Sequence, residues 1–235
     1  MGLLYLLQSN YDFRTKLMLA LFTAAIVLFS LTVHEFSHGV TALALGDPTA
    51  KNRGRLTLNP IKHMNPVGAL MMLLIGFGYA EPVPINPNYF KNRKVGMAVT
   101  AFAGPFSNFI LALIAVFGFR IVINSASSSY EAALAFNQGN SVLYFIGFFL
   151  QLMALMNLSL MVFNLIPIPP LDGSRILNLF LPERYYFQLM RYERYTALIF
   201  FGVIYLSTRV FHFDILFGIP EAIFNGLYSL VSKIF

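Results

Sequence analysis

Long stretches without a charged residue alternate along this chain with short polar and basic segments. A helix is predicted over residues 17–46, because no residue from 17 to 33 is charged and Asp47, followed by Pro48, ends the helical pattern. Two further stretches of low charge predict helices over residues 95–119 and 142–165. About 20 apolar residues are enough to cross the hydrocarbon core of a bilayer. The pattern therefore predicts three membrane-spanning helices.

The segments that connect and follow these helices are less regular. Residues 64–80 also lack charge, but their prolines and glycines favour a re-entrant or surface-lying segment. Residues 53–58 and 83–86 are predicted to form two short strands, which together would make a small β-hairpin. Toward the C-terminus, residues 195–208 and 215–235 predict one or two more membrane helices.

The composition agrees with a membrane protein. Of the 235 residues, 57% are hydrophobic and 11% are charged, whereas soluble domains carry about 25% charged residues. The predicted fold class is an all-α polytopic membrane protein, a single domain of residues 1–235 surrounded by the lipid bilayer. Its three-helix core covers about residues 17–180, and its C-terminal helices cover about residues 195–235.

The net charge of +6 does not indicate nucleic-acid binding, because the basic residues stand between apolar runs and form no single stripe. They occur between the first two helices and after the third, whereas residues 124–141 contain no Lys or Arg. The positive-inside rule then places the C-terminal end of the first helix toward the cytoplasm. The residues behind this prediction are Lys51, Arg53, Arg55, Lys62, Lys91, Arg93, Lys94, Arg175, Arg184, Arg191 and Arg194.

A metal-binding pattern lies inside the first predicted helix. His34, Glu35 and His38 form H-E-x-x-H, in which two histidines four residues apart share one helix face and reach a single Zn²⁺. Glu35 then lies beside the ion, where it is able to take a proton from water. The pattern also arises by chance. Two imidazoles and a carboxylate at membrane depth are costly without a partner or a metal, however, and this cost favours the metal interpretation.

A catalytic zinc takes three protein ligands and keeps one position open. The spacing of residues along the chain does not identify the third ligand by itself. Asp172 is one candidate, because it follows a charge-free stretch over residues 132–171 whose prolines end the third helix. The alternative is that Asp172 caps a helix beginning at Ser174. His63 and His212 are interpreted as solvated or interfacial histidines.

Three motifs in order resemble the site-2 protease family of intramembrane zinc metalloproteases, over about residues 17–180. They are H-E-F-S-H at 34–38, A-G-P-F-S-N at 103–108, and N-x-x-P at 164–167 running into L-D-G at 171–173. The resemblance implies one Zn²⁺ per chain, held by His34, His38 and Asp172, with Glu35 as the catalytic base. It also implies that Asn164, with Pro167 of the same motif, lies near the site and binds substrate.

Asn108, the last residue of the second motif, matches a family position, but the motif does not define its role. Binding near the substrate and helix packing together with Gly104 are equally good interpretations.

The function implied by the resemblance is hydrolysis of a peptide bond in or near the transmembrane segment of membrane-anchored protein substrates. A short form without PDZ or CBS modules is expected, as a multi-pass protein of a bacterial-type cell membrane with its active site toward the cytoplasm. A strand at residues 53–58 or 83–86 would hold an unwound substrate by strand addition. The sequence makes no prediction of oligomeric state.

Two alternatives use the same histidines. A different H-E-x-x-H membrane protease would take its third ligand from a downstream glutamate, and a zinc scaffold or transporter would hold the metal without hydrolysis. Transport would survive Glu35→Gln, whereas proteolysis would not. The glutamates available for the first alternative are Glu81, Glu131, Glu183, Glu193 and Glu221.

Overall fold

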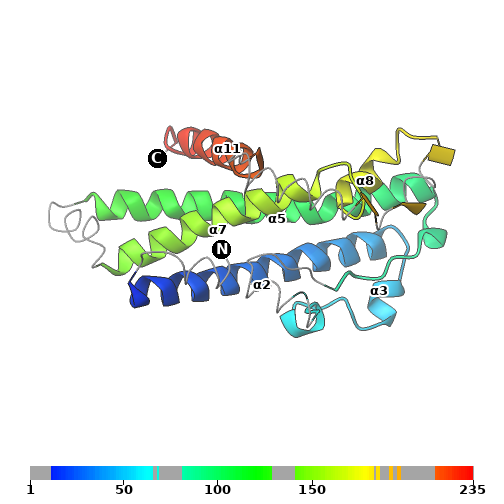
Figure 1. Cartoon of the computed structure of the whole chain (residues 1–235), viewed down its shortest axis with the longest axis horizontal. Helices are drawn as coiled ribbons and strands as arrows, with labels where there is room; N and C mark the ends of the chain where they lie inside the picture. Colours follow the sequence, from blue (N-terminus) through cyan, green and yellow to red (C-terminus); the bar gives the residue numbers. More distant parts are fainter. Residues whose placement is uncertain are drawn as a thin grey trace.

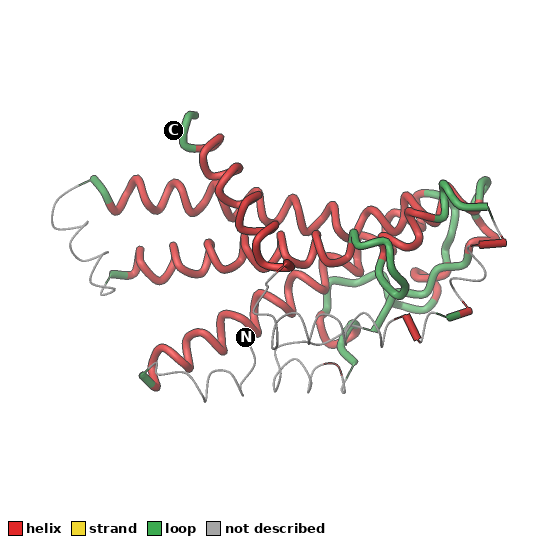
Figure 2. Tube along the Cα trace, turned by 45° about the horizontal axis from the view of Figure 1, so that its top comes forward, coloured by secondary structure: helices red, strands yellow, loops and turns green. Residues whose placement is uncertain are grey.

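The fold is a bundle of helices. The computed structural model describes residues 12–65, 68, 81–128, 141–182, 184–185, 191–192, 195–196 and 215–234. Across these residues the backbone forms helices, turns and loops with no β-strand (Figure 2). The predicted all-α polytopic fold is confirmed.

Three long helices make up the bundle: α2 (Phe13–Ala44), α5 (Arg93–Ala126) and α7 (Val142–Asn164). They lie side by side, and α5 runs antiparallel to the other two (Figure 1). All three are long and apolar enough to cross a membrane. At 1.5 Å per residue, the shortest of them is about 35 Å long, which exceeds the roughly 30 Å of a hydrocarbon core. The three predicted spans are therefore present.

Helix α5 is longer than predicted, since it continues through Arg120 to Ala126. Arg120 is accommodated because its guanidinium lies 6.0 Å from the centre of the Tyr228 ring. Such a contact between a cation and an aromatic ring offsets part of the cost of placing the charge inside the helix bundle.

In α5, large apolar side chains face outward and small or polar ones face inward, which is the reverse of a helix in a soluble protein. Its inward face carries small or polar residues. Gly104 lies against the histidines of α2, whereas Ala112 and Ala115, with the buried Asn108, face α7 and let it approach closely. Its outward face is a stripe of large apolar side chains, which is stable only against lipid. The exposed stripe consists of Val95, Val99, Phe102, Phe106, Ile110, Ile114 and Ile121.

Helix α11 (Ile215–Val231) packs against α5 and α7 and completes the apolar core. Phe224 and Val231 of α11 join Ala112 and Val116 of α5 with Leu158 of α7 in one buried cluster. This element corresponds to the predicted helix over residues 215–235. Most of the other C-terminal prediction, residues 195–208, and most of the segment 64–80 lie outside the described residues.

Four short elements gather at the end of the bundle where α2 and α7 end and α5 begins (Figure 1). They are α3 (Thr49–Asn52), the 3₁₀ turns η1 (Pro60–Lys62) and η2 (Pro87–Tyr89), and α8 (Asp172–Leu177).

The predicted hairpin is wrong, because neither 53–58 nor 83–86 is a strand. Their backbone groups are bonded elsewhere: the Arg55 N–H donates to Ala50 O, and the Val83 N–H donates to the Glu35 carboxylate. His63 departs from its prediction too, since it is buried and its Nε2 bonds Thr57 O at 2.8 Å.

The turn after α2 fixes where the next segments begin. Gly46 adopts φ 104°, and the N–H groups of Gly46 and Asp47 bond Leu43 O and Ala42 O. This is a Schellman C-cap, in which glycine takes the left-handed conformation at little cost. The fully buried Asp47 carboxylate then accepts from the backbone N–H groups of Thr49 (2.9 Å) and Asn86 (2.7 Å).

We predict that Asp47→Ala destabilises the protein by about 3 kcal/mol, because it removes charged hydrogen bonds and leaves buried N–H donors unpaired. Thermal unfolding in detergent measures the loss. The control is Asp12→Ala at the other end of α2, which removes an exposed N-cap and should lower the melting temperature less. Equal melting temperatures for wild type and Asp47→Ala would contradict the role of Asp47.

Candidate metal centre

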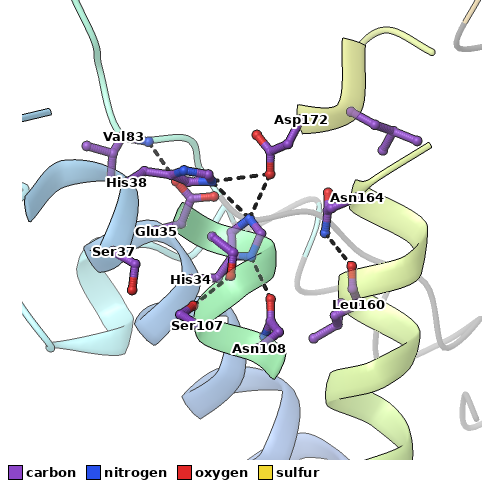
Figure 3. Close-up of polar contacts among 12 residues, drawn as sticks. His34, Glu35, Ser37, His38, Val83, Ser107, Asn108, Leu160, Asn164 and Asp172 are labelled. Atoms are coloured by element: carbon purple, nitrogen blue, oxygen red, sulfur yellow. Dashed lines mark hydrogen bonds and ion pairs between the residues drawn. The ribbon is translucent and has the colours of Figure 1, made fainter. Parts of the chain in front are cut away.

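The two histidines of α2 point together toward a short helix that follows α7. His34 Nε2 and His38 Nε2 lie 3.0 Å apart, and the Asp172 Oδ2 atom lies 3.2 Å and 3.3 Å from them (Figure 3). All three side chains are buried. Two atoms from α2 and one from a residue far along the chain thus form a nearly equilateral triangle.

Hydrogen bonds at the far side of each ring fix the orientation of both imidazoles. His38 Nδ1 lies 2.7 Å from the backbone oxygen of Thr100, and His34 Nδ1 lies 2.7 Å from Asn108 Oδ1. Both partners are oxygens that only accept, so each Nδ1 carries the proton. Each Nε2 is then an unprotonated acceptor directed at the centre of the triangle, as is typical of metal-bound histidines.

Asp172 reaches this centre because the chain turns back sharply after α7. The prolines after Asn164 end the helix, and Asp172 is the first residue of α8. A Cβ on Gly173 would stand 2.3 Å from Leu165 O, so only glycine permits this close return. The N-cap of α8 is Leu171, which makes no side-chain cap bond. The Asp172 carboxylate faces the histidines, so the capping interpretation is not supported.

The electrostatics of Asp172 suit a ligand. Burial raises the pKa of its carboxyl, but positive charge on the imidazoles of His38 and His34, when no metal is bound, lowers it by more, so the pKa lies below its ordinary value. A bound cation would act on the carboxyl in the same direction. The group is therefore ionised at neutral pH, as metal coordination requires.

The donor set and its spacing fit zinc. Ligand atoms about 2.0–2.1 Å from a tetrahedral zinc are about 3.3–3.4 Å from one another, close to the 3.0 Å, 3.2 Å and 3.3 Å found here. Three acceptor atoms without a proton between them repel each other unless a cation lies among them. With three protein ligands, the fourth tetrahedral position remains for water or substrate.

Gly104 of α5 forms the wall of the site behind the imidazoles. A Cβ at this position would lie 2.5 Å from His38 Nε2 and 2.6 Å from His34 Cε1. Any larger residue would push both rings away from Asp172. The glycine of the A-G-P motif therefore gives the two histidines the space they need to converge.

Glu35 belongs to the same cluster. Its carboxylate lies within 4.8 Å of ligand atoms of both histidines, and its Oε2 accepts a hydrogen bond of 2.9 Å from the Val83 N–H. The bond fixes one carboxylate oxygen and leaves the other able to contact water. This geometry suits a proton acceptor beside a metal.

The segment that contacts Glu35 is itself held at several points. Arg55 forms an ion pair of 2.8 Å with the Glu81 carboxylate and also donates to Glu81 O at 2.7 Å. The Glu81 N–H donates to His63 O, and the Asn86 N–H donates to Asp47. The path of residues 81–86 beside Glu35 is thus determined by side chains from the loop after α2.

The remaining predicted site residues have different environments. Asn164 lies at the end of α7 near Asp172, with its Nδ2 donating to Leu160 O at 2.9 Å (Figure 3). Pro167 is exposed in the turn that follows, and its substrate-binding role stays a prediction. Asn108 is fully buried and bonded to His34, which favours a place in the site over helix packing alone.

The glutamate alternatives gain no support from the described residues. Glu81 is paired with Arg55, and Glu221 is an exposed residue of α11. Glu131, Glu183 and Glu193, like His212, lie outside the part of the chain that the structure describes. Asp172 is the carboxylate within 3.3 Å of both histidines.

Sequence reasoning missed three contributors to the site. The Val83 N–H is a backbone group and has no sequence signal. Asn157, which bonds Asn108 Nδ2 at 2.9 Å, belongs to none of the motifs. Its signal was a polar residue in a charge-free span, where such residues mark functional positions. The need for a glycine at position 104, beside the imidazoles, was not predicted either, although Gly104 belongs to the A-G-P-F-S-N motif.

Comparisons with known proteins show the family to which the chain is related. The profile of the family described as "Peptidase family M50" matches residues 22–207. A Bacillus subtilis protein named "Putative zinc metalloprotease YwhC" is 40% identical over 174 residues, which cover 74% of this chain and 75% of that protein. No solved structure gives a significant match.

Mycobacterial relatives are more distant. The protein named "Putative zinc metalloprotease Rip2" of Mycolicibacterium smegmatis is 34% identical over 62% of this chain and 52% of that protein. Its namesake in Mycobacterium tuberculosis H37Rv is 29% identical over 77% of this chain and 64% of that protein. With a family profile spanning most of the chain, and with the H-E-x-x-H and L-D-G motifs meeting at one centre, the protein belongs to peptidase family M50, the site-2 protease family.

Proposed function

We propose that this protein is a zinc-dependent endopeptidase that cleaves membrane-anchored proteins in or near their transmembrane segments. The observation that carries the proposal is the convergence of His34, His38 and Asp172 beside Glu35, on helices long and apolar enough to span a membrane. One zinc ion per chain is the expected cofactor. The zinc metalloprotease names of the relatives support the same conclusion.

The position of the site along α2 supports cleavage within or near the bilayer. His34 stands ten residues before Ala44, the last residue of α2, a distance of about 15 Å along the helix axis. A helix of 32 residues exceeds the hydrocarbon thickness by roughly 18 Å. The site therefore lies near one boundary of the hydrocarbon layer, where a transmembrane substrate and water are both within reach.

The residues of the chain divide the chemistry between them. A zinc ion held there would polarise the scissile carbonyl and make a water molecule more acidic. His34, His38 and Asp172 hold the ion, while Glu35 takes a proton from the attacking water and later delivers it to the leaving amine. The Val83 N–H keeps the Glu35 carboxylate in place during both transfers.

Asn164 is proposed to stabilise the developing oxyanion. One N–H of its amide donates to Leu160 O, so the second N–H remains to donate to the substrate oxygen as negative charge forms. Pro167 helps by ending α7, which sets the end of the helix beside the turn that carries Asp172.

A helical substrate must unwind before its carbonyl reaches the site, because helix hydrogen bonds occupy each carbonyl. Addition of the substrate as a β-strand to residues 81–86 is not favoured. The Val83 N–H already donates to Glu35, and Pro82 and Pro84 beside it have no N–H to donate. Residues 82–84 therefore offer no free N–H to a substrate strand.

The orientation proposed for the site is cytoplasmic, in a cell membrane of the bacterial type. Most basic residues of the described loops, including Lys51, Arg53, Lys91 and Arg93, are at the end of the bundle that holds the site. Arg14 and Lys16 occupy the other end of α2, and the balance still favours a cytoplasmic site.

We predict that Glu35→Gln lowers peptide-bond cleavage by at least 100-fold, because general acid–base groups contribute about 10²- to 10⁴-fold. The variant should retain zinc, since all three ligands remain. Co-expression with membrane-anchored substrates measures fragment formation, and elemental analysis measures zinc. Glu221→Gln is the matched control on an exposed glutamate of α11 and should cleave normally. Equal cleavage by Glu35→Gln and wild type would contradict the role of Glu35, and wild type that binds zinc but forms no fragment would instead favour a zinc scaffold or transporter.

Asp172→Asn should lose most of its zinc on dialysis against a chelator and should lose cleavage with it, because the amide is a much weaker ligand than the carboxylate. Glu81→Gln tests the rival third ligand and should keep its zinc. The opposite result, with zinc retained in Asp172→Asn and lost in Glu81→Gln, would overturn the assignment of Asp172.

For Gly104→Ala we expect loss of zinc and of activity, because the new methyl group would collide with both imidazoles. Gly118→Ala on the same helix is the matched control, since its Cβ would meet only the flexible Leu150 side chain, at 3.2 Å. Zinc content and melting temperature of both variants are the measurements. A Gly104→Ala protein with full zinc content would show that the wall beside the imidazoles is not needed.

A further inference from the structure

A chain of buried hydrogen bonds runs from the third membrane helix to the proposed zinc ligand His34. Asn157 of α7 is fully buried, and its Nδ2 donates to the backbone oxygen of Met153 at 2.9 Å. Its Oδ1 accepts from Asn108 Nδ2 at 2.9 Å, and Asn108 Oδ1 lies 2.7 Å from His34 Nδ1 (Figure 3). The chain therefore has one link on each of α7, α5 and α2.

The direction of this chain is fixed at its origin. A backbone carbonyl only accepts hydrogen bonds, so Asn157 must turn its NH₂ group toward Met153 O and its oxygen toward Asn108. Asn108 must then turn its NH₂ group toward Asn157 and its oxygen toward His34. If either amide were turned over, two acceptors would face each other in a buried site.

The last link determines which nitrogen of His34 carries the proton. Because Asn108 presents an oxygen, His34 Nδ1 is the donor, and Nε2 keeps its lone pair toward His38 and Asp172. For His38 a backbone carbonyl, Thr100 O, does this directly. His34 is bonded to a side-chain amide instead, which could turn either way unless a further residue held it.

We propose that Asn157 is a positioning residue that fixes the amide of Asn108 and thereby holds His34 in the tautomer and orientation that bind zinc. The inference rests on the proposed zinc function and extends it to a residue outside the recognised motifs. Asn157 touches neither the three ligand atoms nor Glu35. An asparagine in an apolar helix interface is costly, and this role accounts for its presence there.

The test compares two substitutions that separate hydrogen bonding from packing. Asn157→Leu keeps nearly the same volume but removes the oxygen that Asn108 needs. Asn157→Asp, when protonated on the oxygen that faces Met153 O, donates there as the amide does and keeps an oxygen that accepts from Asn108. If Asn157 acts only through packing, Asn157→Leu should bind zinc normally and Asn157→Asp, which buries an acid, should bind it more weakly. If Asn157 is a positioning residue, Asn157→Leu should bind zinc more weakly than Asn157→Asp.

Zinc affinity is measured by competition with a chelator on the purified full chain in detergent, independently of proteolysis. We expect Asn157→Leu to bind zinc about tenfold or more weakly, the usual cost of losing a residue that orients a metal-bound histidine. Asn157→Asp should stay within about twofold of wild type. Ser159→Ala is the control, because Ser159 also lies on α7 but donates only to Leu155 O of its own helix.

Cobalt substitution provides a readout that a general loss of stability does not change. The visible absorption of bound Co²⁺ reports the arrangement of its ligands, so Asn157→Leu should alter the spectrum even when fully loaded. Asn157→Asp and Ser159→Ala should reproduce the wild-type spectrum. If Asn157→Leu does not fold, Asn157→Ala removes the same oxygen without adding bulk and should give the same loss of affinity.

The outcomes separate this inference from the proposed function. Wild-type protein that binds no zinc would overturn both. Zinc binding by wild type with equal affinity and an unchanged cobalt spectrum in Asn157→Leu or Asn157→Ala would overturn the role of Asn157 alone. An Asn157→Asp variant that lost as much affinity as Asn157→Leu would also overturn that role.

Discussion

Three acceptor atoms that converge without a proton among them are the constraint on which this structure depends. The Nδ1–H groups of His34 and His38 each donate a hydrogen bond to an oxygen behind the ring, so each Nε2 presents a lone pair to the carboxylate of Asp172. Such an arrangement is unfavourable in a buried site unless a cation binds there. The fold supports the triangle through Gly104 behind the rings and Gly173 beneath the carboxylate.

The membrane accounts for how the rest of the chain is built around this site. Large apolar side chains on the outside of α5 and small or polar ones on its inside are the reverse of a soluble helix. The same close approach of α5 and α7 that small residues permit also brings Asn108 within bonding distance of Asn157. Interhelical hydrogen bonds of this kind contribute only about 1 kcal/mol to stability in membranes. We therefore attribute the importance of this bond to the orientation of His34.

Much of this arrangement could be predicted from the sequence, because its signals are strong. Charge-free stretches located the three long helices, and the spacing of His34 and His38 within a helix placed them on one face. Spacing left two roles open for Asp172, because an acidic residue just before a helix is able either to cap that helix or to bind a metal. The structure favours the ligand, because the return of the chain after α7, a tertiary feature that no local pattern describes, brings Asp172 beside both histidines.

The errors of prediction have physical causes as well. Residues 83–86 were expected to form a strand. Pro82 and Pro84, however, have no N–H to donate to a neighbouring strand, and the Val83 N–H donates to Glu35 instead. His63 was expected to be solvated because it lies in a basic loop, yet a backbone oxygen 2.8 Å away holds it in the interior. Both contacts use a backbone group, the Val83 N–H and the Thr57 oxygen, and a backbone group leaves no signal of its own in the sequence.

X-ray absorption at the zinc edge of the purified chain tests the central claim most directly. The account predicts one zinc per chain with nitrogen and oxygen ligands at about 2.0–2.1 Å and with the scattering pattern of two imidazoles. A chain without stoichiometric zinc, or a bound zinc that shows one imidazole or none, would contradict it.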